Sequence, residues 1–424
     1  MHAVGVEVPA RRARLAPCSI ALVLVGTLLQ RIALPLGSDQ VPLGIPLLLG
    51  ITALGVWTGE FRVTDRKLRA LVVFIGTATV CTLLQVATGS TPSLLSLGLL
   101  FCIYPLVALT ADIGRAGVAA VEEVFLRLMT VAALVSVGQL AVQYAGVPYE
   151  DHLLRVVPES LLLVGYNTGD PITYGDPLYR SNAVLFLEPS FISLFLGIAV
   201  ALALFRRRSW LMVTVLLAGM IPPLAGSGFV VLAPALVVLA LGRDRARLFA
   251  AVPAVVLAVL LALATPLGDL YLERSFEASN PNTSSSARLV QPYGALLPPT
   301  FEDYTTTLIG HGAGTADDYL IDVGLIDVTA PLVPKVLYEY GLVGAVGILA
   351  LLVVFLAVEV RRRPWTVGIF LLFLYVNASF LQSTLVFITL FWISLMPPTD
   401  EPGDVQPEDL VHVPGREPTP ARVG

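Results

Sequence analysis

The sequence predicts an all-α fold: a polytopic integral membrane helix bundle of about 12 transmembrane helices with two long outer loops. The first observation is composition, because 56% of the 424 residues are hydrophobic, 13% are charged and the mean hydropathy is +0.81. A soluble domain carries about 25% charged residues, so the chain is expected in a bilayer. The second is that apolar stretches of about 20 residues recur, the length that crosses about 30 Å of hydrocarbon as a helix.

The expected spans are short of charge and follow one another along most of the chain. They are 17–36, 42–58, 70–88, 93–111, 124–146, 184–205, 209–225, 228–242, 247–268, 333–358, 365–380 and 382–397. A closed membrane barrel needs alternating apolar and polar residues. Runs such as GILALLVVFL at 347–356 do not alternate, so the spans are expected to be helices.

The placement of arginine predicts how the spans are oriented. With twelve spans and a cytoplasmic N-terminus, every basic cluster falls on the cytoplasmic side, as the positive-inside rule requires. These clusters lie at 11–14, 62–69, 206–208, 243–247 and 361–363. No small-residue cleavage site follows the first apolar run, so that run is expected to remain as an uncleaved span. The chain is therefore expected in the inner (cytoplasmic) membrane, multi-pass, with both termini cytoplasmic.

The expected domain organisation alternates groups of helices with the two outer loops. The segments are a cytoplasmic tail at 1–16, helices 1–5 at 17–146, the first outer loop at 147–183, helices 6–9 at 184–268, the second outer loop at 269–332, helices 10–12 at 333–397 and a disordered cytoplasmic tail at 398–424. Within the first loop, EDHLLRVVPESLLLVGY has apolar residues at helical spacing. That spacing predicts a short helix on the bilayer surface.

Cysteine and histidine do not form a pattern that binds metal. The three cysteines lie within expected spans, and the four histidines are far apart in the sequence. No disulfide framework, metal site or other cofactor is therefore expected.

Arginine on the outer loops is scarce, which makes each one informative. The two loops carry 14 acidic residues and four arginines, Arg155, Arg180, Arg274 and Arg288. Arg155 and Arg274 are expected to pair with neighbouring acids. A guanidinium can hold phosphate oxygens bidentately and stays charged, so Arg180 and Arg288 are candidate ligands for an anionic lipid phosphate.

Glu188 and Pro189 are unusual at the expected start of a span. If a helix begins near Arg180, Glu188 lies about 12 Å further along it. Pro189 would then free a backbone carbonyl beside the carboxylate. Two interpretations stay open: a proline kink whose glutamate pairs with arginine, or a polar group that lines a cavity at membrane depth.

Four motifs in order resemble one family. RSNAVLFLEPS at 180–190, SARLVQPY at 286–293, LIGHGAG at 308–314 and LYEYGLVG at 337–344 are similar to elements of bacterial O-antigen and exopolysaccharide repeat-unit polymerases and of the related O-antigen ligases. The resemblance implies transfer of a glycan from undecaprenyl diphosphate to an acceptor hydroxyl, without metal, at the outer face of the inner membrane. It also implies that Arg180 and Arg288 hold the diphosphate.

The sequence departs from this pattern at one informative place. Ligases carry a histidine shortly before the Glu-x-Gly element, and this chain has Lys335 in that region. His311 is an alternative proton acceptor, and Glu339 has either a structural or a catalytic role. The glycines at 310, 312 and 314 either form a tight turn or present backbone N–H groups to phosphate. The expected catalytic residues are Arg180, Arg288, Glu188, His311 and Glu339, and the expected substrate-binding residues are Arg180, Arg288, Gly310, Gly312, Gly314 and Lys335.

The expected function is a membrane polymerase that joins undecaprenyl-diphosphate-linked oligosaccharides. Membrane lipid and other polysaccharide-assembly proteins are further expected partners, and nucleic acid is not one. The alternatives are a ligase that transfers the glycan to another acceptor, and a transporter without chemistry. Transporters often contain internal repeats, and the two halves of this sequence show no convincing repeat.

Overall fold

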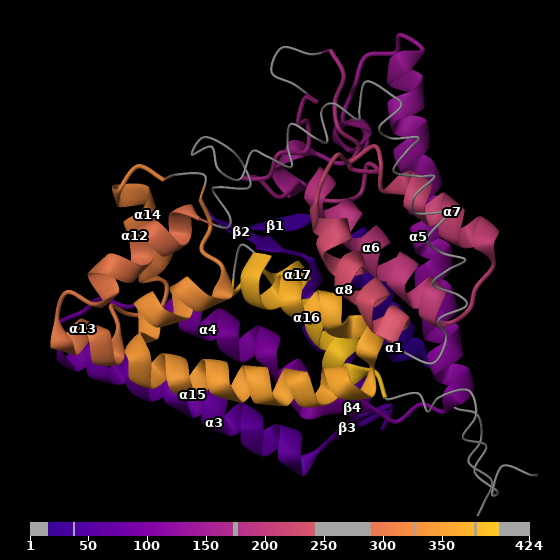
Figure 1. Cartoon of the computed structure of the whole chain (residues 1–424). Helices are drawn as coiled ribbons and strands as arrows, with labels where there is room; N and C mark the ends of the chain where they lie inside the picture. The colour runs from indigo at the N-terminus through magenta and orange to yellow at the C-terminus, as the bar shows by residue number, and fades with distance from the viewer. Residues whose placement is uncertain are drawn as a thin grey trace, which may run out of the picture.

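The computed structural model describes residues 16–36, 39–172, 177–241, 290–325, 328–376 and 380–397. These residues are mostly helical (Figure 1), which confirms the expected predominance of helix. Several sequence predictions fall outside the described residues. They are the span at 247–268, Arg288, both terminal tails and the basic clusters at 11–14 and 243–247.

The helices fall into groups that the loops separate. The first group is α1 (Pro17–Leu28), α2 (Gly44–Trp57), α3 (Asp65–Ala87), α4 (Leu94–Ile103) and α5 (Arg115–Tyr144). The second is α6 (Pro189–Phe205), α7 (Trp210–Gly219) and α8 (Ser227–Leu241). After the gap come α12 (Gln291–Thr300), α13 (Tyr304–Ile309), α14 (Thr315–Asp322), α15 (Leu332–Arg362), α16 (Val367–Leu371) and α17 (Ser383–Leu390). Shorter helical turns are η1 (Tyr104–Ala108), η2 (His152–Arg155), η3 (Glu159–Leu161), η5 (Pro364–Thr366), η6 (Leu372–Val376) and η7 (Phe391–Leu395).

The fold is not purely helical, because the described residues also contain two small antiparallel sheets. Strand β1 (Ala33–Leu36) pairs with β2 (Asp39–Pro42), and β3 (Phe61–Val63) pairs with β4 (Leu109–Ala111). The first pair replaces the end of the span expected at 17–36. Pro35 lacks the backbone N–H that a continuing helix needs, and the chain turns back on itself instead.

Helix length supports fewer membrane spans than the sequence predicts. Of the described helices, α3 and α5 have the length and apolar composition of a span, with 23 and 30 residues. Eight further apolar helices are 10–17 residues long, about 15–25 Å at 1.5 Å per residue. The span expected at 93–111, for example, is α4 followed by η1 and β4. Twelve full spans are therefore not confirmed.

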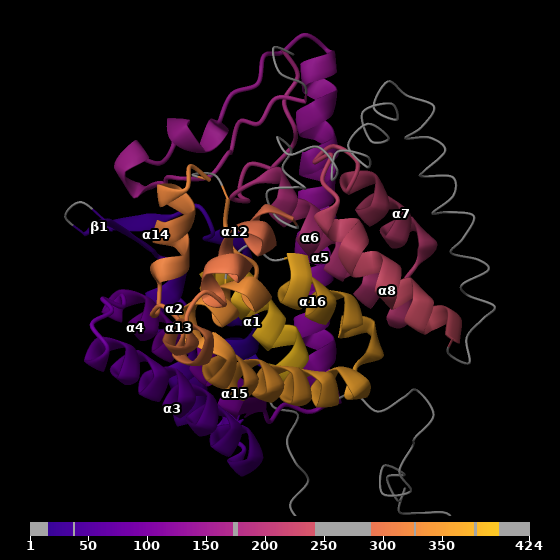
Figure 2. The ribbon, with the colours of Figure 1, turned by 60° about the vertical axis from the view of Figure 1, so that its left-hand side comes forward.

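The core of the bundle surrounds α6. Its residues from Phe191 to Ala203 are all buried, and α5, α7 and α8 pack against it (Figure 2). Helices α3 and α15 lie side by side along another edge of the molecule (Figures 1 and 2).

Basic residues gather at one end of the bundle, which we call the basic end. Lys67 and Arg363 both donate hydrogen bonds to backbone carbonyls of residues 392–394. Arg206 pairs with Glu122 at 2.7 Å, and Arg363 interacts electrostatically with both of these residues. Three of the arginine clusters therefore meet at one end: 62–69, 206–208 and 361–363.

The opposite end of the bundle carries the described parts of the two long loops that are expected to face outward. Because Lys67 and Glu122 lie near the starts of α3 and α5, these helices run from the basic end to the opposite end. Helices α6 and α15 run the other way, since Arg206 and Arg363 follow their last residues. The C-termini of α3 and α5 and the N-termini of α6 and α15 thus meet at the same end.

The first outer loop does not form the surface helix that its apolar spacing predicts. The loop contains only the 3-10 turns η2 and η3 within 150–166. Pro158 interrupts any helix there, and Leu162 pairs instead with Ile32 beside β1. The described part of the second outer loop contains the helices α12, α13 and α14, which were not predicted from the sequence.

Candidate functional site

The predicted site residues that the structure describes lie in two groups at the end opposite the basic end. The first group is on the Arg180 segment, residues 179–188, which precedes α6. The second joins the glycine turn, residues 310–314, to the start of α15. Figure 1 shows α6 in one half of the molecule and α13 and α14 in the other.

The Arg180 segment is not a helix, which corrects the prediction for its start. Helix α6 begins at Pro189, and Glu188 is the extended residue before it, with φ −145° and ψ 164°. A residue before proline avoids the helical region, and proline suits the first helical position, where its missing N–H costs nothing. Pro189 therefore starts the helix rather than kinking it. Glu188 accepts a hydrogen bond from the Ser190 hydroxyl at 3.0 Å.

A backbone turn of rare conformation lies between Arg180 and Glu188. Ala183 has φ 46° and Val184 has φ 67°, and a β-branched residue seldom adopts a positive φ. Side chains of the same segment hold the turn. The Ser181 hydroxyl accepts from the Ala183 N–H at 3.2 Å, and Asn182 Oδ1 accepts from the Val184 N–H at 3.0 Å. Such strain persists only where the surroundings enforce it, and it concentrates at functional sites.

Arg180 is held by one carboxylate and by the backbone. Its Nη1 lies 2.8 Å from Asp170 Oδ2, and its backbone N–H donates to the Asp170 carbonyl at 2.9 Å. The side chain is 13% exposed, and no acceptor among the described residues meets its Nε. The guanidinium thus has a buried donor that no described protein group satisfies, and an anion reaching it would meet a charged partner.

Two glutamines of α5 support the same segment. The Gln143 amide donates to the Tyr179 carbonyl at 3.1 Å and accepts from the Tyr179 N–H at 2.7 Å. One turn earlier, Gln139 accepts from the Ser181 hydroxyl at 2.7 Å. The sequence contained a signal for this support, because two glutamines four residues apart lie on one helix face within an expected apolar span.

In the second group, the glycine turn packs backbone against backbone with the start of α15. The His311 N–H donates to the Tyr338 carbonyl at 2.9 Å, and the Gly312 N–H donates to the Glu339 carbonyl at 3.0 Å. The Gly310 N–H donates to the Thr306 carbonyl at 2.8 Å. These contacts favour the turn over the phosphate-binding interpretation, because two of the glycine N–H groups already have acceptors within the protein.

Two glycines make this close approach possible. Gly310 (φ 80°, ψ −171°) and Gly341 (φ 63°, ψ −171°) both adopt a conformation that is essentially confined to glycine. A Cβ on Gly341 would lie 2.5 Å from the Gly310 nitrogen. Gln85, at the end of α3, is fully buried and donates to the carbonyls of Ile309 and Glu339, the latter at 2.6 Å. The two motifs, some 30 residues apart, thus form one structural unit.

An ion cluster of Lys335, Asp317 and Glu339 lies next to the turn, and two of its three members are buried. The Lys335 ammonium is 2.5 Å from Asp317 Oδ2 and 3.2 Å from Glu339 Oε1. The side chains of Lys335 and Glu339 are each 1% exposed, whereas that of Asp317 is 51% exposed. The ammonium expected to bind substrate therefore has two carboxylate partners, and it joins α14 to α15.

Replacing Lys335 with alanine should lower the free energy of unfolding by about 3–5 kcal/mol, because Glu339 would become an uncompensated buried charge. The measurement is unfolding of the detergent-solubilised protein. Arg155→Ala is the control, since Arg155 forms an exposed pair with Glu150 and should cost less than about 1 kcal/mol. Equal losses in the two variants would contradict the importance of the cluster.

His311 has the geometry of a proton acceptor. Its ring stacks on Tyr338, with centroids 4.2 Å apart and planes at 15°, and its Nε2 lies 3.2 Å from the Pro299 carbonyl oxygen. A carbonyl only accepts hydrogen bonds, so the proton of the neutral ring is on Nε2 and the lone pair is on Nδ1. The side chain is partly exposed, which leaves it accessible to a reactant.

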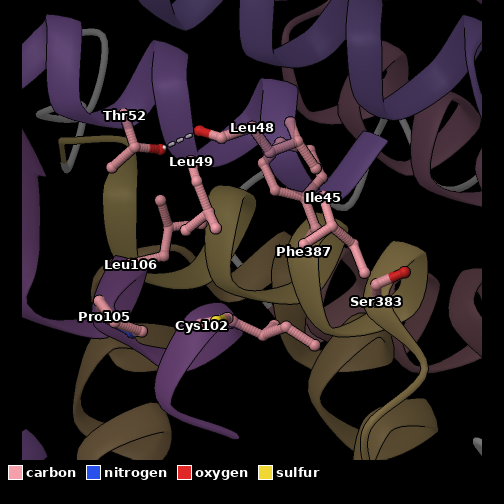
Figure 3. Close-up of a pocket in the computed structure, with 10 residues that line it drawn as sticks. Ile45, Leu48, Leu49, Thr52, Cys102, Pro105, Leu106, Ser383 and Phe387 are labelled. Atoms are coloured by element: carbon pink, nitrogen blue, oxygen red, sulfur yellow. Dashed lines mark hydrogen bonds between the residues drawn. The ribbon is translucent and has the colours of Figure 1, made fainter. Parts of the chain in front are cut away.

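An apolar cavity lies apart from both groups, between α2, η1 and α17 (Figure 3). It is partly open to the surface, and aliphatic and aromatic side chains such as Ile45, Leu106 and Phe387 form its wall. The Thr52 hydroxyl at its edge donates to the Leu48 carbonyl at 2.6 Å. No predicted site residue lines this cavity, and no charged one does, so it does not provide the expected chemistry.

Comparison of the chain with protein-family models, with curated proteins and with solved structures found no match in any of the three. Function is therefore inferred from the sequence motifs and from the geometry of the two groups.

Proposed function

We propose that the protein is a membrane glycan polymerase that joins undecaprenyl-diphosphate-linked oligosaccharide repeat units at the outer face of the cytoplasmic membrane. The proposal depends mainly on Arg180. This arginine is largely buried, and its Nε has no acceptor among the described residues. It lies on a strained segment at the end opposite the basic clusters. A site for an anionic lipid headgroup needs this combination of fixed positive charge and spare donors.

The reaction follows from the chemistry of the proposed substrates. The acceptor hydroxyl oxygen attacks the anomeric carbon of the donor, the bond from that carbon to the phosphate oxygen breaks, and undecaprenyl diphosphate leaves. The hydroxyl proton passes to a base, for which His311 Nδ1 is the first candidate and the Glu188 carboxylate the second. Arg180, and Arg288 from outside the described residues, would neutralise the charge that grows on the departing diphosphate.

The second group supplies support for this chemistry. Lys335 and Glu339 are buried together, so we assign them to holding the glycine turn rather than to contact with substrate. The glycine turn then fixes His311, because the His311 backbone N–H donates to the Tyr338 carbonyl.

The membrane setting is supported by apolar side chains that no other part of the described chain covers. On α3, Val72, Val80 and Leu83 are 55–63% exposed, and on α5 Val131 and Leu134 are each 58% exposed. Exposed apolar faces of this size mark contact with lipid or with another protein. These faces lie on α3 and α5, the two helices of the described residues whose length and apolar composition together fit a span.

Loss of the protein should leave lipid-linked single repeat units and abolish long chains. Extraction and sizing of lipid-linked glycans from cells with and without the gene gives the measurement. If long polymer accumulates on the lipid carrier instead, the protein is the ligase that consumes it. An unchanged glycan pool would contradict both functions and leave the transporter.

Orientation is tested by cysteine labelling from the outer face. In a variant without Cys18, Cys81 and Cys102, a cysteine at Glu302 should react with an impermeant maleimide, because the second outer loop is expected outside. A cysteine at Ser209 should react only after the membrane is permeabilised. Both positions are exposed in the structure, so the reverse pattern would invert the topology.

A further inference from the structure

Arg31 is a buried arginine that the reaction scheme does not use. It lies between α1 and β1 and is 4% exposed. Both of its terminal nitrogens donate to the Asp151 carboxylate, with 2.9 Å between Nη1 and Oδ1. Nη1 also donates to the Val184 carbonyl at 2.7 Å. One guanidinium therefore joins three segments that are far apart in the sequence.

The carbonyl that Arg31 binds belongs to the backbone turn at Ala183–Val184, here called the left-handed turn. Val184 has φ 67° and follows Ala183 at φ 46°, a pair of conformations that valine and alanine reach only with strain. The α5 glutamines hold the segment on the side of Tyr179 and Ser181. Arg31 holds the same segment at the Val184 carbonyl, on the side toward Glu188.

Asp151 keeps Arg31 in place. It accepts from the Leu153 N–H at 3.2 Å, which fixes the carboxylate at the start of η2. Burial raises the pKa of Asp151. The hydrogen bond and the charge of Arg31 lower it by more, so the pKa of Asp151 lies below its ordinary value. Tyr149, a titratable group beside the pair, has its pKa raised to about 12 by burial and by the Asp151 charge, so it stays neutral. The ion pair is therefore intact at neutral pH.

We propose that Arg31 and Asp151 are a positioning pair, which holds the left-handed turn at Ala183–Val184 and thereby sets the placement of Arg180 and Glu188 for the donor diphosphate. The pair acts through the backbone of the Arg180 segment and does not touch the substrate. This role in catalysis rests on the proposed polymerase function, whereas the hold on the turn does not depend on it.

The test is a double-mutant cycle between Arg31 and the strained residue. Arg31→Lys keeps the charge but cannot bind the carboxylate bidentately and the carbonyl at once. Val184→Gly removes the strain, because glycine adopts a positive φ readily. Polymerisation of lipid-linked repeat units by purified protein gives kcat and KM, and unfolding of the same samples gives a readout that needs no activity. The matched control is Arg155→Ala, which removes the exposed ion pair between Arg155 and Glu150 in the same outer loop.

We expect Arg31→Lys to lower kcat at least tenfold while Arg155→Ala stays within twofold of the wild type. Adding Val184→Gly to Arg31→Lys should recover most of the lost kcat and most of the lost unfolding temperature. An Arg31→Lys variant with wild-type kcat, or a loss that Val184→Gly does not relieve in either readout, would overturn the positioning role. If the wild-type protein does not polymerise but the unfolding cycle shows the coupling, the hold on the turn stands and the polymerase function, with the catalytic role of the pair, is rejected.

Discussion

Replacing Arg180 with alanine should reduce polymerisation by about 10²-fold or more, the typical loss when one preorganised donor to a transition-state charge is removed. The guanidinium is fixed by Asp170 at 2.8 Å and is only 13% exposed, so little reorganisation accompanies its contact with a diphosphate. Arg180→Lys should restore little, because an ammonium cannot reproduce the planar fork that holds two phosphate oxygens. The measurement is chain length and rate with purified protein and lipid-linked repeat units.

Two controls separate this effect from misfolding. Arg180→Ala should remain inserted and should unfold within a few degrees of the wild type, since its ion pair with Asp170 is partly solvated, with Asp170 31% exposed. Arg155→Ala removes an exposed arginine from the same outer loop and should retain its activity. Near-normal activity of Arg180→Ala would remove the central residue of the proposed site.

Replacing Gly341 with alanine should lower the free energy of unfolding by about 2–5 kcal/mol, from overpacking and positive-φ strain together. The new Cβ would lie 2.5 Å from backbone atoms of Gly310 and Leu308, and backbone cannot move aside as a flexible side chain can. The glycine turn would separate from α15, and His311 would lose its fixed position. Unfolding of the purified protein and its polymerisation rate should therefore fall together.

Gly324 provides the matched control for this prediction. It also has a positive φ, 83°, but a Cβ there would meet no atom within 4 Å. Gly324→Ala should therefore show the positive-φ strain alone, about 1–2 kcal/mol. A loss in Gly341→Ala no greater than in Gly324→Ala would mean that the close packing of the two motifs contributes nothing.

Much of the helical layout was predictable, because apolar runs and arginine clusters report local composition. The spans expected at 42–58, 209–225 and 228–242 correspond to α2, α7 and α8. The start of α6 was misplaced because the apolar run at 184–187 continues into the helix, while the residue before Pro189 is confined to extended backbone. The β1–β2 hairpin is local, and it was missed because the apolar run continues through residues 32–36, where Pro35 disfavours a continuing helix.

The candidate site was predictable in its residue types but not in its arrangement. Four motifs in order indicated Arg180, Glu188, His311 and Glu339. No local pattern showed that Gln85 would join the glycine turn to α15, or that Asp317 would pair with Lys335. Those contacts depend on where α3 and α14 pack, which periodicity within a single segment does not encode.

Helix α5 determines how far from the hydrocarbon the chemistry would take place. Its 30 residues extend about 45 Å at 1.5 Å per residue, roughly 15 Å more than a hydrocarbon core of about 30 Å. Gln139 and Gln143, which hold the Arg180 segment, lie in the last two turns of this helix. Glu122 and Glu123 of this helix pair with Arg206 and Arg208 at the basic end, so most of the extra length lies there. The proposed headgroup site would then meet a hydrated sugar acceptor at the edge of the hydrocarbon.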